Sequence, residues 1–175
     1  MESPATETEL YAFFDKHGIA YKTHRHDPVF TVGEAQAARA GMNGGHSKNL
    51  FVRDKKKNHA LIIAHEDQRI DLKGLAAQIG LGRVSFASPD RLMAHLGVAP
   101  GSVTPFSLLN AYQRPTPSNR EILVIIDKKL LTFERVYFHP LHNAATTSVS
   151  PEHLVKFIKA CGFEPDIFSF EKPSP

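Results

Sequence analysis

The sequence predicts a mixed α/β fold in which helices surround a largely antiparallel sheet. Two apolar runs, residues 47–54 and 59–65, flank the polar turn KKKN and predict a β-hairpin. A third apolar run at residues 121–127 predicts a buried strand. Because the predicted strands and helices are interspersed without strict β–α–β repeats, we expect a mixed sheet that is mostly antiparallel.

Capping residues indicate where the helices begin and end. Ser88 and Ser150 each precede a proline, which fits the first position of a helix, and Gly97 follows the end of one of them. Before the hairpin we expect a helix capped by Thr6 or Thr8 and ended by Gly18, then a strand in 19–26, then a helix with Thr31 and Glu34 at capping-box spacing that ends at Gly41. After the hairpin we expect helices over 71–80 and 88–97, strands over 121–127, 136–139 and 145–149, and a helix over 150–162.

The length and the cysteine content indicate one domain without disulfides. A chain of 175 residues fits a single domain over residues 1–175, with its core over roughly 5–170 and a frayed tail. The one cysteine, Cys161, excludes an internal disulfide and a cysteine-rich zinc site, and is expected to pack inside a helix. The first residues, MESPATETELYAFF, lack a basic segment followed by an apolar run, so we expect no secretory signal there, and no apolar stretch approaches the ~20 residues that span a bilayer. We therefore expect a cytoplasmic protein with no membrane partner.

The charge distribution leaves two interpretations open. The formal net charge of +3 permits a polyanionic partner without requiring one. The positive charge is local, because Arg53, Lys55, Lys56 and Lys57 lie within five positions. This segment is either a solvated hairpin tip or a patch that contacts phosphates.

Lys48 and Asn49 stand at the start of the predicted hairpin. A lysine there can direct a compact cation at a substrate phosphate or carbonyl, and the asparagine adds an amide donor and an acceptor. The alternative is a surface lysine beside a turn asparagine, and these two residues alone do not decide between the interpretations.

Residues 97–106 form a loop that Pro100 and Pro105 restrict. The backbone N–H groups of Gly101, Ser102 and Val103 could face one point and stabilise a developing oxyanion. An ordinary turn after a helix gives the same Pro-Gly signal, so the spacing leaves both interpretations open.

His139 and Asn143 follow a predicted strand. A histidine there can donate, accept or shuttle a proton near neutral pH. His139 and His142 are three residues apart, but Pro140 disfavours a helix and no carboxylate or thiol lies nearby in the sequence, so we expect no metal site. Glycine-rich phosphate loops and the G-x-S-x-G motif are absent, and we expect no cofactor.

Four segments carry these candidate residues along the chain: SKNLFVRDKKK, IDLKGLAAQIGLGRVSFASPDRL, LGVAPGSVTPFSLLNA and FHPLHNAATTSVS. Their order and spacing, over roughly residues 5–170, resemble the YbaK/ProX aminoacyl-tRNA deacylases, which are relatives of the editing domain of bacterial prolyl-tRNA synthetases. The chain resembles most closely the free-standing ProX branch (PrdX, or ProXp-ala), whose members clear alanine from proline tRNA. The resemblance implies a curved, mostly antiparallel sheet that forms a pseudo-barrel around a pocket, with helices around it.

The resemblance also implies which residues form the site. Lys48 and Asn49 match the family's Lys-Asn pair, and residues 101–105 match its G-x-x-x-P loop. His139 and Asn143 match its histidine and asparagine. Two departures are Ser47, where threonine is common, and Ala111, where relatives often carry an acidic residue.

The implied reaction is hydrolysis of the ester between an amino acid and the terminal ribose of tRNA. Gly101 and the amides that follow it would hold the ester carbonyl, Lys48 would hold the terminal phosphate or ribose, and His139 would shape the pocket. The expected pocket walls are Phe30, Phe51 and Phe106, and the expected phosphate contacts are Arg53, Lys55, Lys56 and Lys57.

The expected substrate is proline tRNA that carries alanine. A synthetase pocket built for proline rejects alanine poorly, since one small apolar difference is worth only ~1–3 kcal/mol, whereas a second, smaller pocket can exclude the proline ring. The alternatives are Cys-, Ser- or Thr-charged tRNA, and a non-catalytic module that binds tRNA or protein. The oligomeric state, and docking on a prolyl-tRNA synthetase, stay open.

Overall fold

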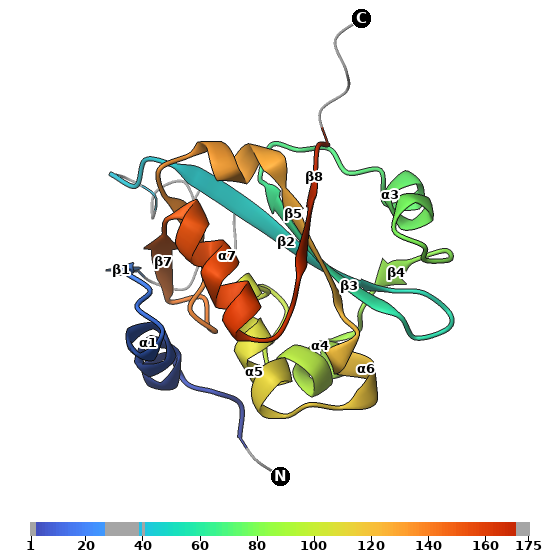
Figure 1. The fold of residues 1–175 in the computed structure, drawn as a ribbon, viewed down its shortest axis with the longest axis horizontal. Coiled ribbons are helices and arrows are strands. Elements are labelled where there is room, and N and C mark those ends of the chain that lie inside the picture. Colours follow the sequence, from blue (N-terminus) through green and yellow to red (C-terminus); the bar gives the residue numbers. More distant parts are fainter. Residues whose placement is uncertain (1–2, 27–38, 40, 171–175) are drawn as a thin grey trace, which may run out of the picture.

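The computed structural model describes residues 3–26, 39 and 41–170, and within them one mixed sheet runs through the molecule. Its strand order is β1-β7-β6-β2-β3-β5-β8, and β4 pairs with β2 beside this path (Figure 1). The strands are β1 (Lys22–Arg25), β2 (Gly45–Arg53), β3 (His59–His65), β4 (Ser85–Phe86), β5 (Leu123–Asp127), β6 (Val136–Phe138), β7 (Ala145–Val149) and β8 (Pro165–Phe168).

The pairing confirms a mixed sheet in which antiparallel neighbours are the larger group. Antiparallel pairs join β1 to β7, β6 to β7, β2 to β3 and β2 to β4. Parallel pairs join β2 to β6, β3 to β5 and β5 to β8. The β2–β3 pair is the predicted hairpin, with a register that runs from Ser47 opposite His65 to Arg53 opposite His59.

Helices cover both faces of this sheet. They are α1 (Glu7–Lys16), α3 (Leu72–Gln78), α4 (Pro89–Leu96), α5 (Leu108–Gln113), α6 (Pro117–Arg120) and α7 (Pro151–Ala160), with 3-10 turns η1 (Pro105–Ser107) and η2 (Lys128–Thr132). In Figure 1, α1 and α7 lie beside β7, and α3 lies beside β4 near the far end of the hairpin.

The capping signals confirm three predicted helix starts. The side chains of Thr6, Ser88 and Ser150 each accept a hydrogen bond from a backbone N–H in the first turn of α1, α4 and α7. Gly97 ends α4 in the left-handed conformation, at φ 65°. The helix expected from Thr31 lies outside the described residues. The sequence did not predict the short elements β4, α5, α6 and β8 or the two 3-10 turns.

The core lies on both faces of the central strands. Every residue of β3 is buried, because alternate side chains enter two apolar clusters: Leu61 and Ile63 enter the larger one, Ala60 and Ile62 the smaller. The larger cluster holds Cys161, which is buried, so the prediction that this thiol packs inside the fold is confirmed.

Two of the expected pocket walls are core residues instead. Phe106 is fully buried and makes edge-to-face contacts with Phe14, Phe138 and Phe157. Phe51 is also buried and stacks on His59, at a ring distance of 5.2 Å. Both rings pack against their own domain, and their role as pocket walls stays a prediction. Phe30 lies outside the described residues.

Candidate active site

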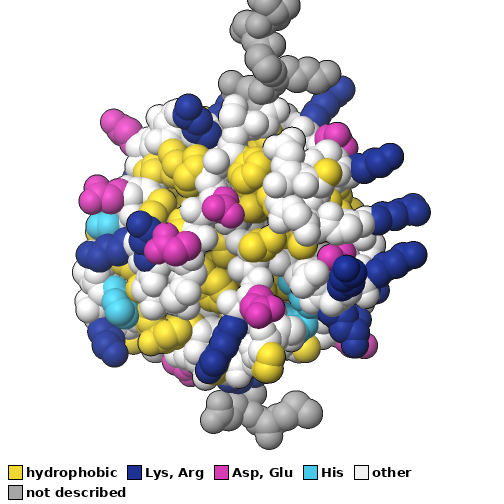
Figure 2. All heavy atoms as spheres, turned by 45° about the vertical axis from the view of Figure 1, so that its right-hand side comes forward, with side chains coloured by type: hydrophobic (Ala, Val, Ile, Leu, Met, Phe, Trp, Pro, Cys, Tyr) yellow, Lys and Arg dark blue, Asp and Glu magenta, His cyan; other side chains and the backbone are white. Residues whose placement is uncertain are grey.

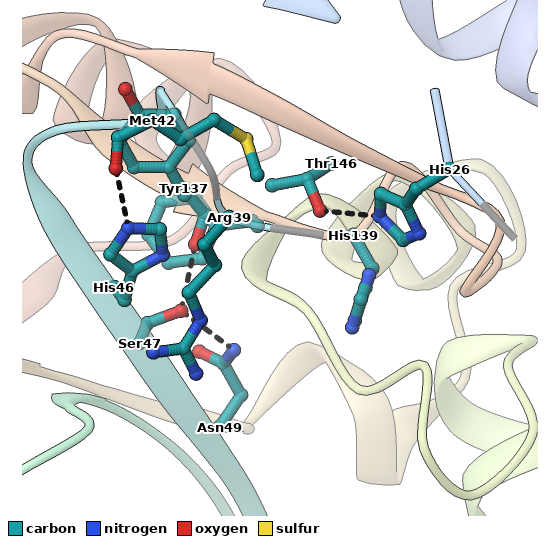
Figure 3. A pocket seen from close by; sticks show the side chains of 10 residues that line it. His26, Arg39, Met42, His46, Ser47, Asn49, Tyr137, His139 and Thr146 are labelled. Carbon is teal, nitrogen blue, oxygen red and sulfur yellow. Dashed lines mark hydrogen bonds between the residues drawn. The ribbon is translucent and has the colours of Figure 1, made fainter. Parts of the chain in front are cut away.

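A small cavity lies where the first half of β2 meets β6 and β7 (Figure 3). Its volume is about 100 Å³. The residues that line it are His26, Arg39, Met42, His46, Ser47, Asn49, Tyr137, Phe138, His139 and Thr146. The parallel pairing of β2 with β6 sets Gly45 opposite Val136 and His46 opposite Tyr137, and so brings the start of β2 beside β6, where the cavity lies.

Alternate side chains along the first half of β2 lie in two different environments. Ser47 and Asn49 line the cavity, whereas the cavity does not include Lys48, which lies between them. Successive side chains of a strand point to opposite faces, so this division is expected for extended backbone. The Lys48 ammonium instead donates to the backbone carbonyl of Gln68. Lys48 and Asn49 therefore lie in different surroundings within the described residues, and the contact of Lys48 with the terminal phosphate or ribose stays a prediction.

The Asn49 amide is oriented by a short chain of hydrogen bonds. Ser47 Oγ donates to the Tyr137 carbonyl at 2.9 Å, and Asn49 Nδ2 donates to Ser47 Oγ at 3.2 Å. Because the Ser47 hydroxyl uses its one proton in the hydrogen bond to the Tyr137 carbonyl, its oxygen can only accept from Asn49. The Asn49 atom that faces Ser47 is therefore the amide nitrogen, and the amide oxygen points the other way. Asn49 Oδ1 is buried and has no hydrogen-bond partner within the described chain. A buried acceptor without a partner is costly, so this oxygen is suited to a donor that a ligand brings.

His139 presents an acceptor to the same cavity. Its Nδ1 lies 3.1 Å from the Ala145 carbonyl, which can only accept, so Nδ1 carries the proton and Nε2 is left as an acceptor in the neutral ring. Burial lowers the pKa of His139, and the nearby His26 and His142 lower it further, while the bond to Ala145 acts in the opposite direction. The ring is therefore neutral near pH 7.

Arg39 lines the cavity with a guanidinium that is already paired. Its Nη1 donates to Glu66 Oε1 at 3.0 Å, and its Nη2 lies 2.7 Å from Glu66 Oε2. Both side chains are about one-third exposed, so the pair lies at the surface of the site. A two-pronged contact of this kind fixes the plane of the guanidinium.

Lys48 is held by a turn that a buried carboxylate organises. Asp127 is fully buried, and its Oδ1 and Oδ2 accept from the N–H groups of Lys129 and His65, each at 2.9 Å. Gln68 Nε2 donates to the same carboxylate at 3.4 Å, so Asp127 positions the turn whose carbonyl binds Lys48.

The loop before α5 does not gather three free amides. The N–H of Ser102 donates to the Ala99 carbonyl at 3.1 Å, with Gly101 at φ 88° inside that turn. Ser102 and Pro105 are buried and Val103 packs against the larger core cluster, and the cavity includes none of them. The turn itself therefore uses the donor of Ser102, and an oxyanion site formed by this loop stays a prediction.

The basic segment lies at the tip of the hairpin. Asp54 organises this tip, since its carbonyl accepts from Lys57 N–H at 3.2 Å and its Oδ1 accepts from Asn58 N–H at 2.9 Å. Lys55, Lys56 and Lys57 are exposed there, and Arg53 is half-buried. Figure 2 shows Lys and Arg side chains, in dark blue, along the right-hand edge of the face that carries the hairpin. Asn143 is half-buried in the turn after β6, outside the cavity lining.

Several residues of the cavity were missed from the sequence. Met42, Tyr137 and Thr146 carry no catalytic signature, and only the pairing of β2, β6 and β7 brings them together. The period of two along a strand could have linked Ser47 to Asn49. Among residues 3–26, 39 and 41–170, no group of three His, Cys, Asp or Glu side chains is placed to hold a metal ion, and no helix is long and apolar enough to cross a membrane.

Comparison with known proteins shows to which family this chain belongs. A model of the aminoacyl-tRNA editing domain matches residues 26–157, a span that includes all the cavity residues. The chain belongs to the aminoacyl-tRNA editing family. It is 40% identical over 154 residues to the prolyl-tRNA editing protein ProX of Acetoanaerobium sticklandii, a match that covers 87% of this chain and 90% of that protein.

One further sequence relative and one solved structure are also similar to this chain. The multifunctional Ser/Thr-tRNA deacylase ProXp-y of Escherichia coli K12 is 30% identical over 105 residues, which cover 58% of this chain and 63% of that protein. A solved structure described as a candidate trans-editing enzyme for prolyl-tRNA synthetase superposes with a TM-score of 0.70 at 19% identity. That match covers 98% of this chain and 100% of the other, so the two share the editing-domain fold.

Proposed function

We propose that this chain is a trans-editing deacylase that hydrolyses the ester of alanine on proline tRNA. The observation that carries the proposal is the small cavity between β2 and β6, where Asn49 Oδ1 and His139 Nε2 are acceptors in a partly apolar wall. Family membership supports an aminoacyl-tRNA substrate, and the cavity supports a small amino acid.

The size of the cavity favours alanine over proline. An apolar cavity of about 150 Å³ holds one benzene ring. The part of the cavity that the described residues enclose has about 100 Å³, which suits a methyl group and an ammonium group better than a proline ring. Met42, Tyr137 and Phe138 supply its apolar surface, and Phe106 packs behind Phe138.

The chemistry needs no nucleophile from the protein. The ester of an aminoacyl-tRNA is already activated, and water can attack its carbonyl when the ester is positioned and the charge that develops is stabilised. The hydroxyl beside the ester on the ribose helps to position this water, and His139 Nε2 can accept a hydrogen bond from either. Burial raises the pKa of the Cys161 thiol, so this side chain stays protonated and away from the reaction.

Lys48 and Gly101 act outside the amino-acid cavity in this proposal. In this proposal Lys48 leaves the Gln68 carbonyl to contact the terminal phosphate or ribose of the tRNA. An added Cβ at Gly101 would meet no atom within 4 Å, so the ester can approach the backbone there. With the Ser102 amide engaged, Gly101 and Val103 are the donors of this loop that the proposal uses.

The test is a panel of esters on one tRNA. Proline tRNA is charged with Ala, Cys, Ser, Thr or Pro and incubated with the native protein, with Lys48→Ala, and with Lys159→Ala as a charge-matched control on α7. Hydrolysis confined to the alanyl ester, and lost only in Lys48→Ala, is the expected result.

The same panel separates the alternatives. Faster hydrolysis of the seryl or threonyl ester would favour the substrate class named for the Escherichia coli relative. Binding of tRNA without hydrolysis of any ester would favour a non-catalytic module and end the proposal. Full activity in Lys48→Ala would remove this lysine from the mechanism.

A further inference from the structure

The turn that carries His139 is anchored to the N-terminal helix. Residues 139–144 connect β6 to β7, and His139, at the start of this turn, lines the cavity. His142, three residues on, points to α1 instead, where its Nε2 lies 2.7 Å from Glu7 Oε2. In this turn His139 therefore lines the cavity, whereas His142 holds the turn to α1 through its hydrogen bond with Glu7.

The hydrogen bonds define the direction of this contact. His142 Nδ1 accepts from the Ala144 N–H at 3.1 Å, so the proton of the neutral ring is on Nε2 and is donated to Glu7. His139 has the opposite arrangement, with its proton on Nδ1 and donated to Ala145. One turn thus holds two histidines in opposite tautomers, each fixed by a specific partner.

Glu7 is itself held by two further groups. Arg25 of β1 approaches it with Nη2 2.7 Å from Oε1 and Nη1 3.1 Å from Oε2, and Tyr11 Oη donates to Oε1 at 2.8 Å. Burial alone would raise the pKa of Glu7, but the bonds from Arg25, His142 and Tyr11 outweigh it and lower the pKa to about 2. Glu7 is therefore a charged acceptor at any ordinary pH.

The turn needs such an anchor because its backbone is in an unfavourable conformation. Leu141 has a φ of 73°, in the left-handed region that residues with a side chain rarely adopt. A conformation of this kind persists when surrounding contacts impose it. The His142–Glu7 bond on one side and the His139–Ala145 bond on the other enclose Leu141.

We infer that Glu7 is a positioning residue, which fixes the 139–144 turn through His142 and so directs His139 Nε2 into the cavity. Glu7 and Arg25 precede residue 26, where the match to the editing domain begins, so α1 and β1 are parts of the working site that the family match does not include. The catalytic consequence rests on the proposed function, whereas the structural coupling does not.

The first experiment measures how Glu7 affects the tautomer of His139, and it needs no enzyme assay. The ring nitrogens of ¹⁵N-labelled histidines are observed by NMR in the native protein, Glu7→Ala, Glu7→Gln and Glu9→Ala. Glu9 is the matched control, because it lies in the same first turn of α1 and is exposed. Loss of the single Nδ1–H tautomer of His139 in Glu7→Ala, with Glu9→Ala unchanged, is the expected result.

The second experiment measures how the same variants change the rate of deacylation. In single-turnover hydrolysis of alanyl-tRNA, Glu7→Ala is expected to lower the rate constant about 10- to 100-fold, as a small misplacement of a catalytic group does, with tRNA affinity unchanged. Glu7→Gln, which can still accept from His142, is expected to recover most of the rate.

The outcomes are distinct. An unchanged His139 tautomer in a folded Glu7→Ala protein overturns the inference, whatever the deacylation assay gives. If Glu7→Ala does not fold, His142→Ala tests the same bond from the other side and must produce the same change at His139. If the native protein hydrolyses no ester, the proposed function fails and the NMR result still decides the coupling.

Discussion

Ser47 controls the orientation of the Asn49 amide through a single hydroxyl group. Its proton goes to Tyr137 and its oxygen accepts from Asn49, so the unpaired Asn49 oxygen has only one orientation. The relevant property of position 47 is therefore the hydroxyl.

Ser47→Ala is expected to lower the deacylation rate about fivefold, since the loss of one hydrogen bond is worth ~1 kcal/mol. The amide of Asn49 would then be free to turn its Nδ2 toward the substrate. Ser47→Thr, which keeps the hydroxyl, should have a rate close to that of the native protein. The measurement is single-turnover hydrolysis of alanyl-tRNA, and equal rates in Ser47→Ala and Ser47→Thr would contradict the role of the hydroxyl.

At the scale of elements, the β2–β3 hairpin connects the cavity to the basic tip. From Asn49 to the end of β2 at Arg53 the strand extends ~13 Å at ~3.3 Å per residue, and Lys55 lies beyond it in the turn. The tip is therefore too far from the cavity to contact the aminoacyl group. If it contacts tRNA, it contacts phosphates farther along the acceptor end.

Replacement of Lys55, Lys56 and Lys57 by alanine should weaken tRNA binding and reduce the steepness of its salt dependence. Each lost phosphate contact removes about 0.7–0.9 from the slope of log K against log salt concentration, or about 2–3 for all three. The control replaces Lys16, Lys22 and Lys159, which are also exposed but lie on α1, β1 and α7. A native slope in the hairpin variant would mean that the lysines are only solvated.

The same hairpin illustrates what local sequence could and could not predict. The two apolar runs, the polar turn and the capping residues of α1, α4 and α7 depend on near neighbours, and the structure confirms these elements. The short elements β4 and β8 were missed because a strand of two or four residues takes its place from the strand it pairs with.

At the scale of the whole molecule, a buried histidine links the hairpin to α4. The ring of His59 on β3 lies 4.3 Å from that of His95 on α4, and neither of its nitrogens has a hydrogen-bond partner within the described chain. Burial, then the charges of His95, Arg91 and Arg53, lower its pKa to about 4, while the nearby backbone of Lys57 acts in the opposite direction. The fold is therefore more stable when His59 is neutral.

Stability should fall as the pH falls from 7.5 to 5. In this window the unfolded chain takes up a proton at His59, whose ordinary pKa is 6.5, and the folded chain does not, so the free energy of unfolding loses about 2 kcal/mol. His59→Phe should flatten this dependence, and His17→Gln, at the C-terminal cap of α1, should not. Urea denaturation at both pH values is the measurement, and an equal loss in His59→Phe would show that other groups cause it.

The sequence by itself determined the main helices and the hairpin, and its four ordered segments indicated the editing family. These features follow from side-chain periodicity, capping and turn residues, which act over a few positions. Only the tertiary structure decided which residues share the cavity. Ser47 meets Tyr137 across 90 positions, Glu7 meets His142 across 135, and Lys48 turns away from its neighbour Asn49. Such contacts depend on which strands pair and which faces are buried, and these are properties of the whole chain.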